Sequence, residues 1–278
     1  MFKSTIAAFG VVLAGVGLAA AADKPTEITI ATEGAYEPWN FTGPGGKLEG
    51  LEVDLANDLC ARMKVKCTII AQDWDGLIPS LTARKFDAIM ASMIITEKRL
   101  AVIAFSEPYA PSSATIMVDK SGPLATVPGV DKTVDLGGDP AAAKAELDRL
   151  APLLKGKSIG VQASTANAVF LDKYFKGVVE VREYKTTEQH DLDLKAGRID
   201  GVLAQKAALS ALLGKPDYKD FKLVGPTFVG DVFGKGFAVG LRKEDAALKA
   251  MFDDAIKSAR GDGTINRLAE KWLKTALY

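Results

Sequence analysis

Side chains that follow the ends of predicted β-strands suit a small ligand carrying both a positive and a negative group. Arg99 can grip a carboxylate through two parallel hydrogen bonds, which a lysine cannot do. Tyr36 and Trp74 can hold a flat or cationic group by cation–π contact, worth up to about 2 kcal/mol when desolvated. Glu33 can neutralise a guanidinium or an ammonium group. Taken singly, Arg99 could also be a solvated helix residue, and the two aromatic rings could be core residues.

Hydroxyl and amide groups extend this candidate site. Ser164 and Thr165 are expected at the N-terminus of a helix, where hydroxyls and free backbone N–H groups form an anion seat. Simple N-capping explains the same two residues without a ligand. The remaining candidates also lie at strand ends, where open α/β sheets bind their ligands: Ala91, Ser92, Met93, Ala163 and Gln205.

The motifs that are missing favour a binding protein over an enzyme. The sequence has no G-x-S-x-G nucleophile motif, no phosphate-binding loop, no metal-spaced histidine cluster and no cofactor motif. Its single histidine, His190, stands in a charged helical stretch and is predicted to be exposed. With 35 basic and 35 acidic residues, the net charge gives no reason to expect nucleic acid or an anionic membrane as partner.

The N-terminus has the pattern of a secretory signal peptide over Met1–Ala22. Lys3 supplies the positive charge, an apolar run from Ile6 to Leu18 follows, and four alanines offer cleavage sites before Asp23. The alternative is a transmembrane anchor, but the run is short for a span that needs about 20 apolar residues. We expect cleavage and export to an oxidising compartment.

Export changes the interpretation of the two cysteines. Cys60 and Cys67 are seven residues apart, and an isolated pair in an exported protein most often forms a disulfide. So short a loop would add about 2–3 kcal/mol to stability. Free thiols remain the alternative at this point.

Short apolar runs alternate with helical periodicity, which is typical of an α/β fold. The first unit has predicted strands at 27–31, 68–71 and 87–91 and helices at 51–63, near 77–81 and after Thr96. The second has predicted strands at 158–161, 178–184, 199–203 and 221–224 and helices at 141–150, 165–175, around 192–196 and at 207–213. Residues 121–140 are expected to form a surface excursion.

Two C-terminal helices show the clearest pattern, because apolar residues from Leu248 to Ile256 and from Ile265 to Trp272 repeat at helical spacing around a break at 261–263. We assign them to the first unit. The chain then passes between two lobes twice, near Tyr109–Ser113 and near Pro226–Gly236.

Seven segments carry a resemblance to a known family: EGAYEPWNF (33–41), GGKLEG (45–50), DLANDLC (54–60), WDGLIPSL (74–81), FDAIMASM (86–93), KAGRID (195–200) and GLRKED (240–245). The chain resembles periplasmic solute-binding proteins of the polar amino acid type, and more narrowly the branch that binds lysine/arginine/ornithine, octopine or nopaline. The resemblance runs from Ile28 to Trp272.

The resemblance implies a type II periplasmic-binding-protein fold, with lobe 1 at 23–111 and 234–278, lobe 2 at 112–233 and the ligand cleft between them. It implies a monomer in the periplasm that delivers its ligand to the permease of an ATP-binding-cassette importer. Arg99, helped by Ser164 and Thr165, would hold the ligand α-carboxylate, and Ser92 would add contacts. Tyr36 and Trp74 would stack on the ligand side chain, with Glu33 at its distal charge. Cys60 and Cys67 coincide with a disulfide of this group.

Two departures bear on the ligand. Amino acid binders usually have Asp where this chain has Gln205 and Ser or Thr where it has Ile94, and both partner the free α-ammonium. Without them a buried primary ammonium would lose about 1–3 kcal/mol or more. We therefore expect an opine or another N-substituted basic amino acid, with a plain basic amino acid as the alternative. A more distant alternative is an enzyme like cyclohexadienyl dehydratase, which shares the fold and for which Glu33 is the candidate acid.

Overall fold

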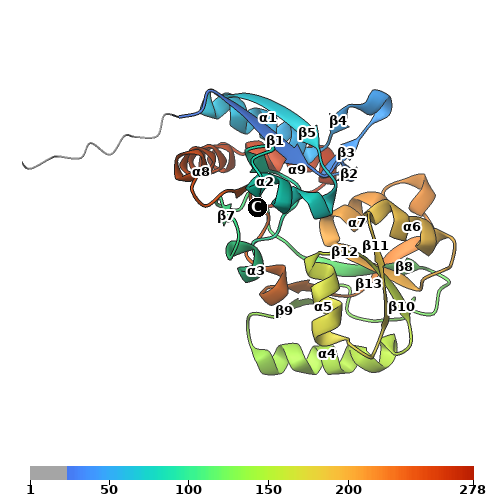
Figure 1. The fold of residues 1–278 in the computed structure, drawn as a ribbon. Helices are drawn as coiled ribbons and strands as arrows, with labels where there is room; N and C mark the ends of the chain where they lie inside the picture. The colour runs from blue at the N-terminus through green and yellow to red at the C-terminus, as the bar shows by residue number, and fades with distance from the viewer. Residues whose placement is uncertain (1–23) are drawn as a thin grey trace, which may run out of the picture.

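The computed structural model describes residues 24–278, so the predicted signal peptide lies outside the described residues. These residues form two lobes, each an open sheet with helices packed on its faces (Figure 1). Within this range no helix combines the length and the apolar character that a bilayer crossing requires.

The sheet of the first lobe has the strand order β5-β1-β6-β14-β7. β1 (Glu27–Thr32), β5 (Lys66–Ala71) and β6 (Ala88–Ile89) run parallel, with the β1 residue Ile30 beside Ile69 and Ala88. β14 (Gly240–Leu241) is antiparallel to both β6 and β7 (Ala104–Phe105). The sheet is therefore completed by a segment from near the C-terminus of the chain.

Five helices flank this sheet: α1 (Leu51–Met63), α2 (Leu77–Thr82), α3 (Glu97–Leu100), α8 (Ala246–Gly261) and α9 (Thr264–Leu273). Leu51, Leu55 and Leu59 recur at every fourth position of α1, and all three are fully buried. α8 and α9 both pack against α1. The Cys60–Cys67 disulfide predicted from the sequence is present, joining α1 to β5 with a Cα–Cα distance of 6.1 Å.

A small three-stranded sheet next to the cleft has no counterpart in the sequence-based prediction. It consists of β2 (Ala35–Tyr36), β3 (Asn40–Thr42) and β4 (Leu48–Glu49). Strands of two or three residues are too short to show alternation, so no periodic signal could reveal them. Trp39, which stands between β2 and β3, is 1% exposed and meets Phe237 edge-on.

The sheet of the second lobe has the order β11-β10-β12-β8-β13-β9. Its parallel half consists of β10 (Ser158–Gln162), β11 (Glu180–Tyr184) and β12 (Gly201–Gln205). β8 (Ala114–Asp119) is antiparallel to β12 and to β13 (Phe221–Val229), and β9 (Thr133–Asp135) forms the far edge. β9 lies inside the stretch expected to be a surface excursion.

Four helices cover this second sheet: α4 (Pro140–Leu154), α5 (Ala166–Tyr174), α6 (Thr187–Lys195) and α7 (Lys206–Leu213). Within the described residues, four short 3-10 helices complete the elements: η1 (Pro44–Gly46), η2 (Trp74–Gly76), η3 (Pro216–Tyr218) and η4 (Asp231–Phe233). α4 runs four residues beyond the predicted end at Leu150, because Leu150 and Leu154 are both buried on one face.

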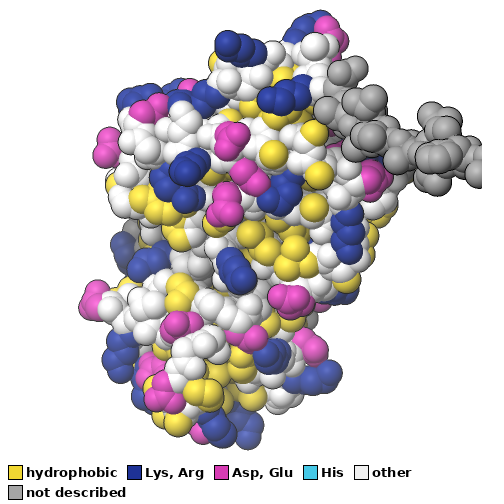
Figure 2. All heavy atoms as spheres, turned by 90° about the vertical axis from the view of Figure 1, so that its left-hand side faces the viewer, with side chains coloured by type: hydrophobic (Ala, Val, Ile, Leu, Met, Phe, Trp, Pro, Cys, Tyr) yellow, Lys and Arg dark blue, Asp and Glu magenta, His cyan; other side chains and the backbone are white. Residues whose placement is uncertain are grey.

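The two segments that link the lobes run side by side in opposite directions. The Tyr109 N–H donates to the Phe237 carbonyl and the Phe237 N–H to the Ala110 carbonyl, each at 2.8 Å. Gly236 has a φ of +120°, and a Cβ there would lie 2.5 Å from the Ala110 carbonyl oxygen. Figure 2 shows the waist between the larger and the smaller lobe, with charges of both signs interspersed.

Candidate functional site

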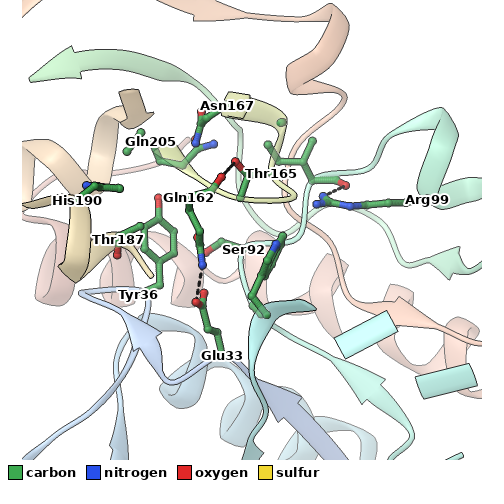
Figure 3. Close-up of a pocket in the computed structure, with 15 residues that line it drawn as sticks. Glu33, Tyr36, Ser92, Arg99, Gln162, Thr165, Asn167, Thr187, His190 and Gln205 are labelled. Atoms are coloured by element: carbon green, nitrogen blue, oxygen red, sulfur yellow. Dashed lines mark hydrogen bonds between the residues drawn. The ribbon is translucent and has the colours of Figure 1, made fainter. Parts of the chain in front are cut away.

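A small cavity lies between the lobes where strand ends from both sheets meet (Figure 3). Glu33 follows β1, Trp74 follows β5, and Ser92 follows β6. From the other lobe, Gln162 ends β10 and Gln205 ends β12. The carboxyl ends of parallel strands thus converge on one space, as the rule for open α/β sheets requires.

Most of the residues singled out from the sequence line this cavity: Glu33, Tyr36, Trp74, Ala91, Ser92, Arg99, Thr165 and Gln205. Three others do not. Met93 points into the core of lobe 1 and is 1% exposed, since side chains alternate along extended chain. The backbone N–H of Ala163 donates to the Tyr184 carbonyl at 2.9 Å, so this residue pairs within lobe 2 and does not line the cavity. Ser164 is exposed at a left-handed turn with a φ of +59° and lines a wider groove beside the cavity.

Arg99 brings a positive charge without a carboxylate partner to the cavity. α3 positions it, and the N-cap Thr96 accepts the Arg99 N–H as predicted. Nη1 donates to the Ile94 carbonyl at 2.9 Å, and Cζ lies 5.2 Å from the centre of the Trp74 ring. Among residues 24–278, no carboxylate lies within ion-pair distance of this guanidinium. Burial lowers the Arg99 pKa to about 10, so the group stays charged at neutral pH.

Glu33 supplies the opposite charge from a position that is only 8% exposed. Burial raises its pKa to about 7, and the hydrogen bond from Gln162 offsets part of that rise. The Gln162 Nε2 atom donates to Glu33 Oε1 at 2.6 Å across the cleft (Figure 3). A cationic ligand group at this place would favour the ionised carboxylate.

Two aromatic rings form part of the lining. Tyr36 is 8% exposed, and the backbone N–H of Gln205 in the other lobe faces its hydroxyl oxygen. Trp74 is half-buried, and its indole N–H donates to the Ser164 carbonyl at 3.4 Å. Each ring therefore contacts the opposite lobe as well as the cavity.

Behind Ser92, which lines the cavity, lies the buried carboxylate of Glu52, which the sequence analysis missed. Glu52, on α1, accepts hydrogen bonds from the Ser92 N–H at 2.6 Å and from Asn40 Nδ2 at 2.6 Å, and also from the Tyr109 hydroxyl. It is 1% exposed, and burial raises its pKa while its donors oppose that rise. Glu52 thus ties Ser92, which lines the cavity, to Tyr109 in the segment that links the lobes.

The wall formed by lobe 2 presents neutral hydrogen-bonding groups. Thr165 is the N-cap of α5 and accepts the Ala168 N–H at 3.4 Å, which confirms the predicted cap. Gln205 Oε1 accepts the Ser113 backbone N–H at 3.0 Å. Because its oxygen is engaged there, the amide NH₂ of Gln205 is the end that remains for a ligand.

Seven further residues line the cavity: Ile94, which the sequence analysis named as one of the two departures, and Gln162, Ala166, Asn167, Thr187, His190 and Ala204. Gln162 and Ala204 lie in the last two positions of β10 and β12, at strand ends of the kind where the sequence analysis expects ligand contacts. The prediction that His190 is exposed is wrong, since the side chain is 1% exposed. α6 packs against β10 and β2, which covers this residue, whereas Glu188 on the same helix faces solvent.

Polar contacts hold the two lobes together around the cavity. Besides the Glu33–Gln162 hydrogen bond, Lys185 Nζ lies 2.7 Å from Asp73 Oδ2, and Lys215 Nζ lies 2.6 Å from Glu37 Oε1. In both ion pairs the lysine comes from lobe 2 and the acid from lobe 1. The structure is therefore a closed form of the cleft.

Two sheets of this order, joined by paired crossing segments around a cleft, define a type II periplasmic-binding-protein fold. The sequence profile of the bacterial extracellular solute-binding proteins, family 3, matches residues 28–275, and the chain belongs to this family. The family resemblance seen in the sequence and the observed fold therefore indicate the same class of protein.

Individual relatives place the chain more closely. It is 50% identical over 276 residues to an octopine-binding periplasmic protein of Rhizobium meliloti, with 93% of each chain covered. It is 36% identical to a lysine/arginine/ornithine-binding periplasmic protein of Escherichia coli, with 95% of each covered. A solved structure of a periplasmic His/Glu/Gln/Arg/opine family-binding protein from Silicibacter pomeroyi, in complex with lysine, matches with a TM-score of 0.71 at 29% identity, covering 90% of this chain and all of that one.

Proposed function

We propose that this chain is the substrate-binding component of an ATP-binding-cassette importer and that it binds an opine such as octopine, or another N-substituted basic amino acid. The lobes, 23–111 with 234–278 and 112–233, close on the ligand. The ligand's α-carboxylate meets Arg99, its side chain lies along Tyr36 and Trp74, and its distal cation meets Glu33.

One observation carries this proposal: the cavity is lined by the Arg99 guanidinium, by the buried Glu33 carboxylate and, on the side away from Arg99, by the amide of Gln205 (Figure 3). Gln205 turns its oxygen to the Ser113 N–H and keeps its NH₂ for the cavity. That arrangement offers a free ammonium no charged partner, while it suits an acid arm attached to the ligand nitrogen. The relative at 50% identity is named for octopine, the relative at 36% for unsubstituted amino acids.

Free arginine or lysine is the second candidate ligand. Arg99, Glu33 and the two aromatic rings would serve it equally well, and solved relatives at 28% and 29% identity are described with arginine and with lysine bound, respectively. The two candidates differ only in the substituent on the α-nitrogen. A comparison of the two ligands on one protein therefore separates them.

The remaining functional assignments follow from the same relatives. They are periplasmic binding proteins, not enzymes, so we propose that the chain acts in the periplasm after removal of residues 1–22, as a monomer, and without catalysing a reaction. The partner is the membrane permease of the importer. Turnover of prephenate or arogenate by the purified protein would contradict the absence of catalysis.

A thermal-shift screen of the mature chain tests the ligand class. The panel contains arginine, lysine, octopine and nopaline, each well above its dissociation constant. A ligand at about 100 times its Kd adds about 2.7 kcal/mol to stability, which raises the melting temperature measurably. We expect the largest shift from an opine. A larger shift from free arginine, or no shift from any member of the panel, would contradict the proposal.

A further inference from the structure

The buried imidazole of His190 has one nitrogen with no hydrogen-bond partner within residues 24–278. The side chain is 1% exposed and lines the cavity between the lobes. Its Nδ1 lies 3.0 Å from Asp191 Oδ1, whereas Nε2 is buried and unpartnered. Because an unsatisfied buried polar atom costs about 1–3 kcal/mol, this nitrogen calls for a partner that the chain itself does not supply.

The surroundings of His190 fix the direction in which it can bind. Asp191 is held in turn by the Tyr218 hydroxyl, which donates to Oδ2 at 3.2 Å. The Tyr184 ring meets the imidazole edge-on, with ring centres 6.1 Å apart. With one edge engaged by Asp191 and one side closed by Tyr184, the Nε2 edge is the one left for a ligand.

The place of His190 in the cleft indicates which part of a ligand it would meet. Figure 3 shows His190 and Arg99 on opposite sides of the cavity, with Gln205 nearer to His190. His190, Tyr36 and Thr187 line both this cavity and a second, adjoining hollow. A ligand held by Arg99 and branched at its nitrogen can therefore extend past Gln205 toward His190.

We propose that His190 binds the carboxylate of the substituent on the ligand's α-nitrogen, and so determines specificity for opines over free amino acids. This inference rests on the proposed function. His190 binds the acid arm as an imidazolium, with Nδ1–H donated to Asp191 and Nε2–H donated to the ligand. Solvent supplies any proton that Nε2 needs for this donation.

The charges around His190 fit an imidazolium between two carboxylates. Asp191 on its own helix supplies one negative charge, and the acid arm supplies the other. From the neighbouring elements, Tyr184, Tyr218 and the lobe 1 residue Tyr36 are neutral phenols at physiological pH. Glu33 lines the same cavity and would be neutralised by the distal cation of the ligand. The second carboxylate of the ligand therefore meets the positively charged His190 and not only the acidic side chains Asp191 and Glu33.

Calorimetric titration of the native protein and of His190→Leu with octopine and with arginine tests this role. Both ligands carry the guanidinium and the α-carboxylate, so arginine is a reference that cancels the contributions of Arg99 and Glu33. We expect H190L to weaken octopine binding by about tenfold to a hundredfold and to change arginine binding by less than about twofold. His190→Gln, which keeps a donor at similar reach, should lose less than H190L. Melting temperatures without ligand show whether each variant is folded. If H190L is not folded, the comparison of the two ligands is made with H190Q instead.

Titration in two buffers of different ionisation enthalpy adds a readout that packing alone would not move. The native protein should exchange a different number of protons with octopine than with arginine, and H190L should lose that difference. Equal proton uptake for the two ligands, or equal loss of both affinities in H190L, would overturn the role of His190. A native protein that binds arginine but not octopine would contradict the proposed function itself, which is a different result.

Discussion

The two walls of the cleft differ in what they offer a ligand. Lobe 1 supplies the charged and aromatic groups, Arg99, Glu33, Tyr36 and Trp74. Lobe 2 supplies neutral or weakly basic hydrogen-bonding groups: Gln162, Thr165, Asn167, Thr187, His190 and Gln205. The charges that any basic amino acid needs therefore lie on one lobe, and the groups that can distinguish one such ligand from another lie on the other.

This division suggests how closure and selection are linked. A ligand can first bind to the charges of lobe 1, and only contacts made with lobe 2 favour the closed form. Glu33 of lobe 1, for example, accepts a hydrogen bond from Gln162 of lobe 2 in this closed form. Changes in lobe 1 should weaken all ligands alike, whereas changes in lobe 2 should alter the preference among them.

The largest expected effect is that of Arg99→Ala. Loss of a buried, charge-assisted pair with the ligand carboxylate should weaken both arginine and octopine by about a hundredfold or more. Calorimetry measures both constants. Arg84→Ala is the matched control, because Arg84 is exposed and paired with Glu244 away from the cavity, and it should leave binding unchanged. Affinity of R99A within tenfold of the native value would show that Arg99 is not the anchor.

Glu33 should make arginine binding depend on pH. Its pKa is about 7 in the ligand-free closed form, and the cation prefers the ionised carboxylate. Below pH 7 a proton must be lost on binding, so the affinity for arginine should fall by about tenfold per pH unit and level off above pH 7. Calorimetry between about pH 5 and 8 measures this slope. Glu33→Gln should bind weakly at every pH, and a native affinity that is flat across this range would contradict the assignment.

The same shift has a consequence for stability without ligand. The unfolded value is 4.5 and the folded value about 7, so the folded protein holds an extra proton on Glu33 between these values. The contribution of this group to the free energy of unfolding is therefore fully favourable below about pH 4.5 and is lost as the pH rises toward 7.

Gln205→Asp should change preference rather than overall affinity. The new carboxylate would pair with a free ammonium and repel an acid arm, so the ratio of octopine to arginine affinity should fall by about tenfold or more. Gln205→Asn shortens the side chain equally without adding charge and separates the two effects. Competition between the two ligands, followed by calorimetry, gives the ratio directly. An unchanged ratio in Q205D would remove Gln205 from the account of selectivity.

The smallest effect is expected for the ion pairs that cross between the lobes at the surface. Lys215 and Glu37 are about 40% exposed, and exposed pairs contribute about 0–1 kcal/mol. Lys215→Ala should therefore weaken octopine by less than about fivefold, and the difference should shrink in high salt. Lys66→Ala removes an exposed pair within lobe 1 and should have no effect on binding. A large, salt-independent loss in K215A would mean that this pair holds the cleft closed.

The helices and strands that have a periodic or continuous apolar pattern could be predicted from the sequence. The apolar spacing in α1 and in α8 and α9 marks helices with one buried face, and the parallel strands β1, β5, β10 and β12 are short apolar runs. The strands β2, β3, β4 and β14 could not be found in this way, since two or three residues show no period. Their pairing is set by tertiary contacts.

The charged half of the site was more accessible to sequence reasoning than the neutral half. Residues such as Arg99 and Glu33 carry distinctive chemistry and follow strand ends. His190 stands among Glu188, Asp191 and Asp193, and a charged stretch normally indicates a solvated helix face. The structure shows that α6 turns His190 and Asp191 inward and leaves Glu188 outside. That choice depends on the packing of α6 against β10 and β2, which local composition does not encode.

A side-by-side calorimetric titration of the mature chain with octopine and with arginine tests the central claim most directly. If lobe 2 is built for a substituted nitrogen, octopine should bind at least about tenfold more tightly, which corresponds to about 1.4 kcal/mol. Arginine binding as tightly as octopine, or more tightly, would contradict the claim.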